Sequence, residues 1–193
     1  MLSNSKAINI DDYLTIEALE DDLTIDVHIH IEDPLEYCID GSGNWITKYS
    51  DSANHVYITI NTGQFISFRG NLTRSINDGE SGVAVFYVNK FCNVKGNVMS
   101  LLYGDNGKNN YSLNIQDCFH FMFSESKIID ASELLLPATT LSSGCYCGMF
   151  SSCTGLTHAP ELPATNLAYG CYQAMFDNCS SLIEAPELHA TTM

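Results

Sequence analysis

Basic residues are scarce in this chain of 193 residues. It has eight Lys and Arg residues against 23 Asp and Glu residues, which gives a formal net charge of −15. A surface of this sign repels phosphate groups, and no cluster of Lys and Arg interrupts it. The composition therefore argues against binding to nucleic acid and to anionic membranes.

Long apolar runs and catalytic motifs are also missing. No stretch approaches the roughly 18 apolar residues of a membrane-spanning helix, so no membrane insertion is expected. Residues 1–13 lack the apolar core of a signal peptide. The chain has no G-x-S-x-G nucleophile elbow and no phosphate-binding glycine loop. We therefore predict a protein that is not an enzyme, with no catalytic residue and no cofactor.

An internal repeat is the clearest pattern that is present. Residues 136–161 and 162–187 align without a gap and are identical at 15 of 26 positions. A degenerate unit precedes them at 118–135, and a partial unit follows at 188–193. One such unit cannot bury its apolar face alone, so tandem units are expected to stack and cover one another.

Within one unit, Leu141, Cys145 and Met149 follow one another at four-residue spacing. This spacing predicts one face of a short helical segment. An extended segment is expected to follow, because Pro160 and Pro163 oppose regular helix.

The eight cysteines do not form the pattern of a disulfide scaffold. Four of them, Cys145, Cys153, Cys171 and Cys179, recur at equivalent positions of the two units. Equivalent cysteines would lie one layer apart in a stack, where small side chains fit. We therefore interpret them as small buried residues rather than as disulfide partners or metal ligands.

The repeat motif LPATTL…GCY..MF..C..L..APE resembles the BspA-like leucine-rich repeats of gut Bacteroidetes, related bacteria and their phages. The resemblance covers residues 118–193 and extends to the upstream sequence segments YCIDGSGNW and GNVMSLLYGDN. It implies a solenoid with a short strand and a helical turn in each unit, used for attachment or protein recognition. It supplies no catalytic residues.

This chain has fewer units than longer members of that family and no evident C-terminal cap. The last unit is therefore expected to leave an apolar end. A binding partner, self-association through this uncapped repeat, and a truncated sequence are three explanations that stay open.

The first hundred residues have a different sequence pattern from the repeats, because they contain short segments rich in β-branched and aromatic residues. Turn signals separate these segments, including Asp-Gly at 40–41 and 78–79. The expected strands lie in 13–19, 23–31, 35–40, 44–49, 55–60, 65–70 and 82–88, with a last strand and a transition in 91–107.

Seven or more short strands joined by tight turns predict an antiparallel sandwich. We expect a fold of the α+β class: a β-sandwich-like module at 1–104, followed by a leucine-rich-repeat solenoid at 105–193. The first module is expected to cover the apolar face of the first repeat.

Two segments contain residues that could bind an ion, and each has a simpler interpretation. His28 and His30 alternate along the segment 23–31 and would share a face, where two imidazoles could bind a metal. The sequence identifies no further ligand, so an exposed polar face is favoured. Asp40, Ser42 and Asn44 have calcium-loop spacing, but position 51 is Asp where such a loop has Glu, and a turn is favoured. No metal site is assigned.

The variable positions of the repeat are the natural candidates for a binding surface, although their variation is equally compatible with drift on a solvated surface. Glu161 and Glu187 recur in both units, whereas the other candidates differ between units. The candidate binding residues are Thr157, His158, Glu161, Tyr169, Asp177, Ile183, Glu184 and Glu187.

These observations favour a non-enzymatic interaction or adhesion module that binds a protein or a glycan. The alternative is a phage virion component, such as a tail, fibre or head decoration protein. A carbohydrate-active enzyme is a third hypothesis without a supporting motif. A cell-surface or secreted location is expected if a leader was removed, and a virion or cytoplasmic location otherwise.

Overall fold

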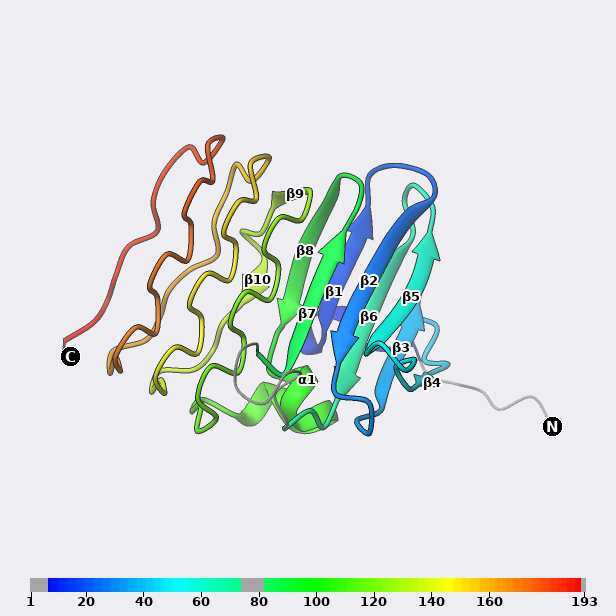
Figure 1. Cartoon of the computed structure of the whole chain (residues 1–193), viewed down its shortest axis with the longest axis horizontal. Helices are drawn as coiled ribbons and strands as arrows, with labels where there is room; N and C mark the ends of the chain where they lie inside the picture. Colours follow the sequence, from blue (N-terminus) through cyan, green and yellow to red (C-terminus); the bar gives the residue numbers. More distant parts are fainter. Residues whose placement is uncertain (1–6, 74–81, 192–193) are drawn as a thin grey trace.

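The computed structural model describes residues 7–73 and 82–191, and the described chain is mainly β-sheet (Figure 1). The strands of the N-terminal half are β1 (Leu14–Ala18), β2 (Leu23–Ile29), β3 (Leu35–Ile39), β4 (Ile46–Lys48), β5 (His55–Ile60), β6 (Phe65–Gly70), β7 (Ala84–Val88) and β8 (Cys92–Asn97). Each segment that the sequence predicted to be extended contains one of these strands. The expected turn at 40–41 is present, and the one at 78–79 lies outside the described residues.

The strands form two sheets that pack face to face (Figure 1). One sheet has seven strands in the order β10-β8-β1-β6-β3-β4, where β10 is Leu134–Leu135 and β9 (Ile128–Asp130) also pairs with β8. The other sheet has the order β5-β2-β7. The alternation along β2 explains the packing, because Leu23, Ile25, Val27 and Ile29 are fully buried while the residues between them are only half-buried. The expected antiparallel sandwich is therefore present in the strand module.

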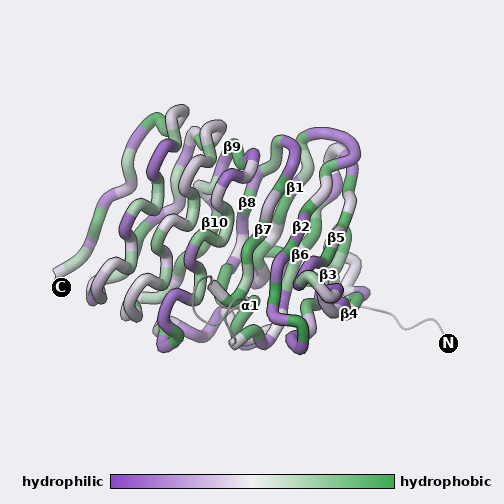
Figure 2. The backbone as a smooth tube through the Cα atoms, in the orientation of Figure 1, coloured by the Kyte–Doolittle hydropathy of each residue, from purple (hydrophilic) through white to green (hydrophobic). Residues whose placement is uncertain are grey.

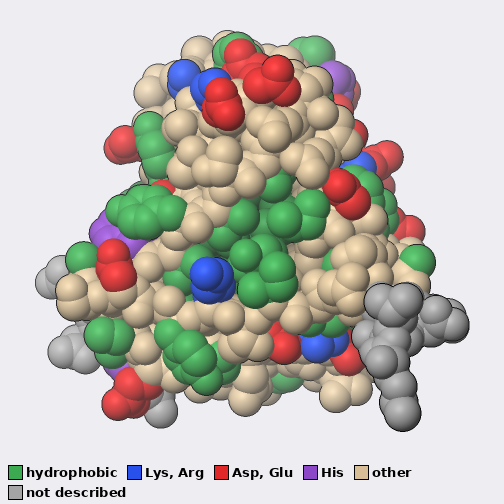
Figure 3. Space-filling model, turned by 90° about the vertical axis from the view of Figure 1, so that its right-hand side faces the viewer, with side chains coloured by type: hydrophobic (Ala, Val, Ile, Leu, Met, Phe, Trp, Pro, Cys, Tyr) green, Lys and Arg blue, Asp and Glu red, His purple; other side chains and the backbone are tan. Residues whose placement is uncertain are grey.

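Short helical segments lie at the ends of the sandwich. They are η1 (Ile10–Asp12), α1 (Ser100–Tyr103) and η2 (Gly104–Asn109). In the part of the chain that the structure describes, no helix has the length and apolar character needed to cross a membrane. Figure 3 shows the end of the sandwich away from the repeats, where hydrophobic side chains gather in the centre.

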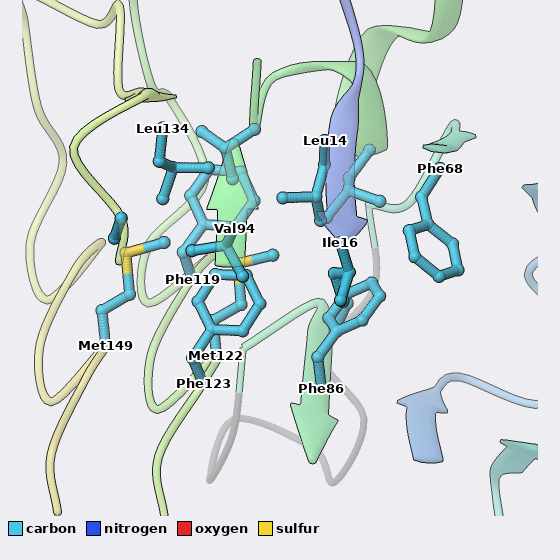
Figure 4. Packing of buried hydrophobic residues seen from close by; sticks show 14 of the residues in the cluster. Leu14, Ile16, Phe68, Phe86, Val94, Phe119, Met122, Phe123, Leu134 and Met149 are labelled. Carbon is cyan, nitrogen blue, oxygen red and sulfur yellow. The ribbon is translucent and has the colours of Figure 1, made fainter. Parts of the chain in front are cut away.

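β8 joins the sandwich to the repeats. It pairs antiparallel with β1 on one side and parallel with β9 (Ile128–Asp130) and β10 (Leu134–Leu135) on the other. Figure 4 shows side chains from the strands and from the first coils pointing toward one another in a shared core. The first repeat is therefore covered by the strand module, as the sequence predicted.

Beyond β10 the chain runs in coils that lie side by side, with hydrophobic segments recurring in each coil (Figures 1 and 2). Two columns of stacked aromatic rings run through successive coils, with ring centroids 5.5–5.7 Å apart. The columns are Phe119–Tyr146–Tyr172 and Phe123–Phe150–Phe176. Residues 26 or 27 positions apart thus occupy equivalent places, which is the stacking that the repeat period predicted.

The expected helical segment of each unit is not a helix. The amide of Cys147 donates to the carbonyl of Gly144, three residues earlier, but the amide of Gly148 donates to Gln173 of the next coil. Backbone φ is positive at every fourth residue, which interrupts a right-handed helix. These residues are Gly144, Gly148 and Ser152. The segment is therefore a run of turns that shares its hydrogen bonds with the neighbouring coil, and its four-residue period still directs Cys145 and Met149 into the core.

The last described coil exposes large apolar side chains. Tyr169, Ile183 and Leu188 are 89%, 71% and 57% exposed. The last described coil thus has exposed apolar side chains, and self-association through it stays a prediction.

The aromatic column gives a direct test of coil stacking. Phe150 is fully buried between Phe123 and Phe176, so Phe150→Ala is expected to lower the free energy of unfolding by about 3–5 kcal/mol. The matched change Phe176→Ala removes a half-buried ring that has a neighbour on only one side, and is expected to cost about 1–2 kcal/mol. Urea unfolding measures the free energy of unfolding of both variants. An equal decrease in the two variants would contradict the stacking.

Candidate functional site

An open groove crosses the two complete repeat units on one edge of the coil stack. Two equivalent segments line it, residues 157–162 and residues 183–187, together with Ser132 and His189. Its volume is about 500 Å³. The groove is therefore made mostly of the same part of the repeat, presented twice.

Backbone hydrogen bonds between coils hold the two segments side by side. The amide of Thr157 donates to Ile129 at 2.8 Å, and the amide of Ile183 donates to Thr157 at 3.1 Å. A parallel bridge also pairs Leu162 with Leu188. Because the repeat period and the hydrogen-bond spacing agree, equivalent residues are placed one layer apart.

The groove combines an apolar lining with carboxylates. Ala159 and Pro160 of one unit and Ala185 and Pro186 of the next supply apolar atoms. Three exposed glutamates, Glu161, Glu184 and Glu187, also line the groove, and none of its lining residues is Lys or Arg. The groove thus presents negative charge beside an apolar surface.

A small polar cluster lies at one end of the groove. His158 Nδ1 is 2.9 Å from the hydroxyl of Thr157 and 3.7 Å from a carboxylate oxygen of Asp130. The Thr157 hydroxyl also donates to the carbonyl of Ile129 at 2.7 Å. These contacts hold Thr157 and His158 in defined positions at the groove.

Six of the eight residues proposed from the sequence line this groove. They are Thr157, His158, Glu161, Ile183, Glu184 and Glu187. The structure does not bring Tyr169 and Asp177 to it. The carbonyl of Tyr169 accepts from Gly144, and the carbonyl of Asp177 accepts from Ser152, so their main chains hold coils together.

Sequence reasoning missed several lining residues. Ser132 lies 26 positions before His158, and the Ala-Pro pair recurs at 159–160 and 185–186. The recurrence of this pair is visible in the sequence, which predicts an apolar contact for Ala159 and a break in helix at Pro160 but not a place in a groove. Extending the repeat alignment back by one unit would have indicated Ser132, whereas His189 is equivalent to Pro163, which does not line the groove.

The two histidines considered as metal ligands do not form a pair. β2 ends at Ile29, so His30 lies beyond the strand, where its Nδ1 accepts from the amide of Glu32. His28 instead lies opposite His55 of β5, with ring centroids 3.9 Å apart. The neighbour of His28 is therefore His55 of the adjacent strand, and His30 follows the end of β2.

The segment weighed as a calcium loop is a turn. Asp40 has a φ of 50°, and its carboxylate accepts from the amide of Phe65 at 3.1 Å. The hydroxyl of Ser42 accepts from the amide of Asn44. These side chains therefore stabilise the turn and its contact with β6, as the favoured interpretation held.

The four repeat cysteines, Cys145, Cys153, Cys171 and Cys179, are buried, as predicted, and all eight cysteines are free thiols. The Cys153 thiol donates to the carbonyl of Phe123, and the Cys179 thiol donates to the carbonyl of Phe150, each at 3.0 Å. Burial raises the pKa of Cys118 and that of Cys153 to about 12. Such thiols stay protonated at neutral pH, which disfavours a nucleophilic role.

Comparison with known protein families, with curated proteins and with solved structures finds no match to this chain. The chemistry of the groove and of the buried residues is therefore the evidence from which a function has to be inferred. An open groove with an apolar lining and a few charged groups suits non-covalent recognition.

The buried thiols predict a loss of stability at high pH. In the unfolded chain a thiol has a pKa near 9, whereas burial raises the pKa of Cys118 and Cys153 to about 12. The contribution of these two protonated thiols to the free energy of unfolding is therefore fully present below pH 9. It is lost as the pH rises toward 12, because the thiols ionise more easily in the unfolded chain.

The thermal midpoint measured from pH 7 to 11 checks this expectation. The thermal midpoint of the double variant Cys118→Ala/Cys153→Ala should fall less steeply above pH 9 than that of the wild type. Cys147→Ala, at the half-exposed cysteine, serves as the comparison and should change the slope less than the double variant does, because Cys147 is less buried than Cys118 and Cys153. A double variant with an undiminished slope would rule out these thiols as the cause.

Proposed function

We propose that this protein is a non-enzymatic interaction module that binds a protein or glycan partner through the groove at residues 157–162 and 183–187. The observation that carries the proposal is the gathering of three glutamates and two Ala-Pro pairs, from two repeat units, into one open groove. Among the two partner classes, a protein segment that carries Lys or Arg fits this chemistry best.

The coil stack is proposed to be a short leucine-rich-repeat solenoid on a β-sandwich base. Parallel bridges between equivalent positions, such as Thr140 with Asn166, support this assignment. Solenoids of this kind present continuous surfaces on which equivalent residues of successive units contact one ligand. The resemblance of the repeat wording to BspA-like repeats, which serve attachment, points to the same class of function.

Electrostatics indicate the sign of the partner. Glu161, Glu184 and Glu187 line the groove without any Lys or Arg, and the chain as a whole carries a net charge of −15. An approaching cationic segment is attracted from a distance, whereas an acidic one is repelled. Ala159, Pro160 and their equivalents would contact the aliphatic part of Lys side chains.

The carboxylates are exposed, so each ion pair with a partner contributes modestly. Exposed pairs are worth about 0.2–1 kcal/mol each, and three such pairs correspond to roughly a 3-fold to 150-fold change in affinity. Binding should therefore weaken as salt is raised to several times the physiological concentration.

A titration with defined peptides tests the proposal. The probe is a labelled 12-residue peptide with four Lys residues spaced by Ala, Pro and Thr, and its partner peptide has Gln in place of each Lys. Fluorescence anisotropy should show binding of the Lys peptide only. The triple variant Glu161→Gln/Glu184→Gln/Glu187→Gln should weaken that binding by about threefold or more.

A charge-matched variant separates the groove from the overall charge. Asp11→Asn/Asp22→Asn/Glu125→Gln removes three exposed acidic side chains that do not line the groove. It should bind the Lys peptide within about twofold of the wild type. Equal weakening in both variants, or equal binding of the Gln peptide, would refute recognition in the groove. Selective binding on an array of neutral glycans would assign the groove to the other partner class.

A further inference from the structure

A cluster of two histidines and an aspartate lies on the three-stranded sheet, at the other end of the molecule from the groove (Figure 1). Asp26 and His28 belong to β2, and His55 is the first residue of β5. Their ligand-type atoms all lie within 4.8 Å of one another. Among the described residues, this is the group of metal-binding side chains that the fold brings together.

The strand register places the three side chains on one face. Asp26 and His28 are two residues apart along β2, so both point to the same side of the sheet. His28 lies directly opposite His55 in the antiparallel pair of β2 and β5. Because this register also buries Ile25 and Val27 on the other face, a slip that separated the cluster would expose the core.

Contacts within the cluster show how closely the groups converge. Nδ1 of His55 is 2.8 Å from one oxygen of Asp26, and Nε2 of His28 is 3.3 Å from the other. The carboxylate thus lies between a nitrogen of each ring. Small side-chain rotations would allow all three groups to contact one ion.

Neighbouring groups hold His55 in place. The ring of Tyr57 stacks on the His55 ring, with centroids 5.5 Å apart and planes 5° from parallel. The carboxylate of Asp51 accepts hydrogen bonds from the amides of Ala53 and His55, which fixes the loop that leads into β5. A ligand that is held in this way loses less conformational freedom on binding a metal.

We propose that Asp26, His28 and His55 bind one zinc ion. Imidazole nitrogen and carboxylate oxygen are ligands that zinc prefers, whereas magnesium and calcium prefer oxygen ligands alone. The side chains of His28, His55 and Asp26 are 34%, 23% and 19% exposed, so the site is open to solvent on one side. Water would complete a tetrahedral set of ligands.

The proposed ion would fasten an edge strand. β5 lies at the edge of its sheet and pairs with β2, while β7 lies on the other side of β2. Two ligands come from β2 and one comes from β5, so a bound ion would link the two strands at the end where β5 begins. The expected role is therefore to stabilise the edge of the sandwich, independently of the groove.

Isothermal titration calorimetry of the chelator-treated full chain with zinc chloride tests the site. One zinc ion per chain is expected to bind with micromolar affinity or better, and the thermal midpoint should rise with added zinc. Magnesium and calcium should produce neither effect. Cobalt(II) should give the strong visible absorption of a tetrahedral complex, which is a readout independent of stability.

Variants identify the ligands. Asp26→Asn, His28→Ala and His55→Ala should each weaken zinc binding by about 100-fold or more, with circular dichroism confirming that each variant is folded. His30→Ala, which changes a histidine just beyond β2, is the matched control and should bind zinc within about twofold of the wild type.

Two outcomes would overturn the assignment. The first is a wild-type chain that binds no stoichiometric zinc. The second is zinc binding that survives both His28→Ala and His55→Ala, which would place the metal elsewhere. If a histidine variant fails to fold, Asp26→Asn, which preserves the size of the side chain, decides the result.

Discussion

The pairing of β8 with the first coil is the interaction on which the rest of the structure depends. β8 is antiparallel to β1 on one side and parallel to β9 and β10 on the other. A stack of repeats cannot begin without a surface that satisfies the backbone groups and covers the apolar face of its first unit. The sandwich supplies both at β8, so the hydrophobic core continues from the strands into the coils without interruption.

The need of backbone groups for hydrogen-bond partners also determines how the coils and the groove are arranged. Each coil directs part of its amide groups toward the next coil, so the units must stay in register and equivalent side chains must stack. Aromatic rings fill the interior of the stack, and the Ala-Pro segments lie at its edge. The groove that is proposed to contact a partner is thus built from one short segment, presented by two successive units.

Local patterns predicted more than long-range ones. The strands, the repeat period and the burial of the cysteines follow from alternation and from self-similarity, which are readable along the chain. The helical segment was predicted wrongly because a four-residue period is shared by a helix and by a run of turns with positive φ at every fourth residue. Six groove residues were identified because the repeat itself brings them together.

His55 shows why the cluster with Asp26 and His28 could not be predicted from the sequence. Its pairing with His28 depends on the register between β2 and β5, which are separated by β3 and β4 in the sequence, and no local pattern specifies that register. The neighbouring His30 was the visible candidate, but β2 ends before it. Histidine pairs formed across strands become apparent only once the three-dimensional arrangement is known.

Both proposed ligands are cationic, as the charge of the chain favours, but different forces would hold them. The glutamates of the groove are exposed, so their attraction for a basic segment is screened by salt and depends on several weak pairs. Zinc at Asp26, His28 and His55 would be held by coordination bonds, which salt affects little and which need deprotonated imidazoles. Raising the ionic strength would therefore separate the two sites, weakening peptide binding while leaving zinc in place, whereas lowering the pH would release zinc first.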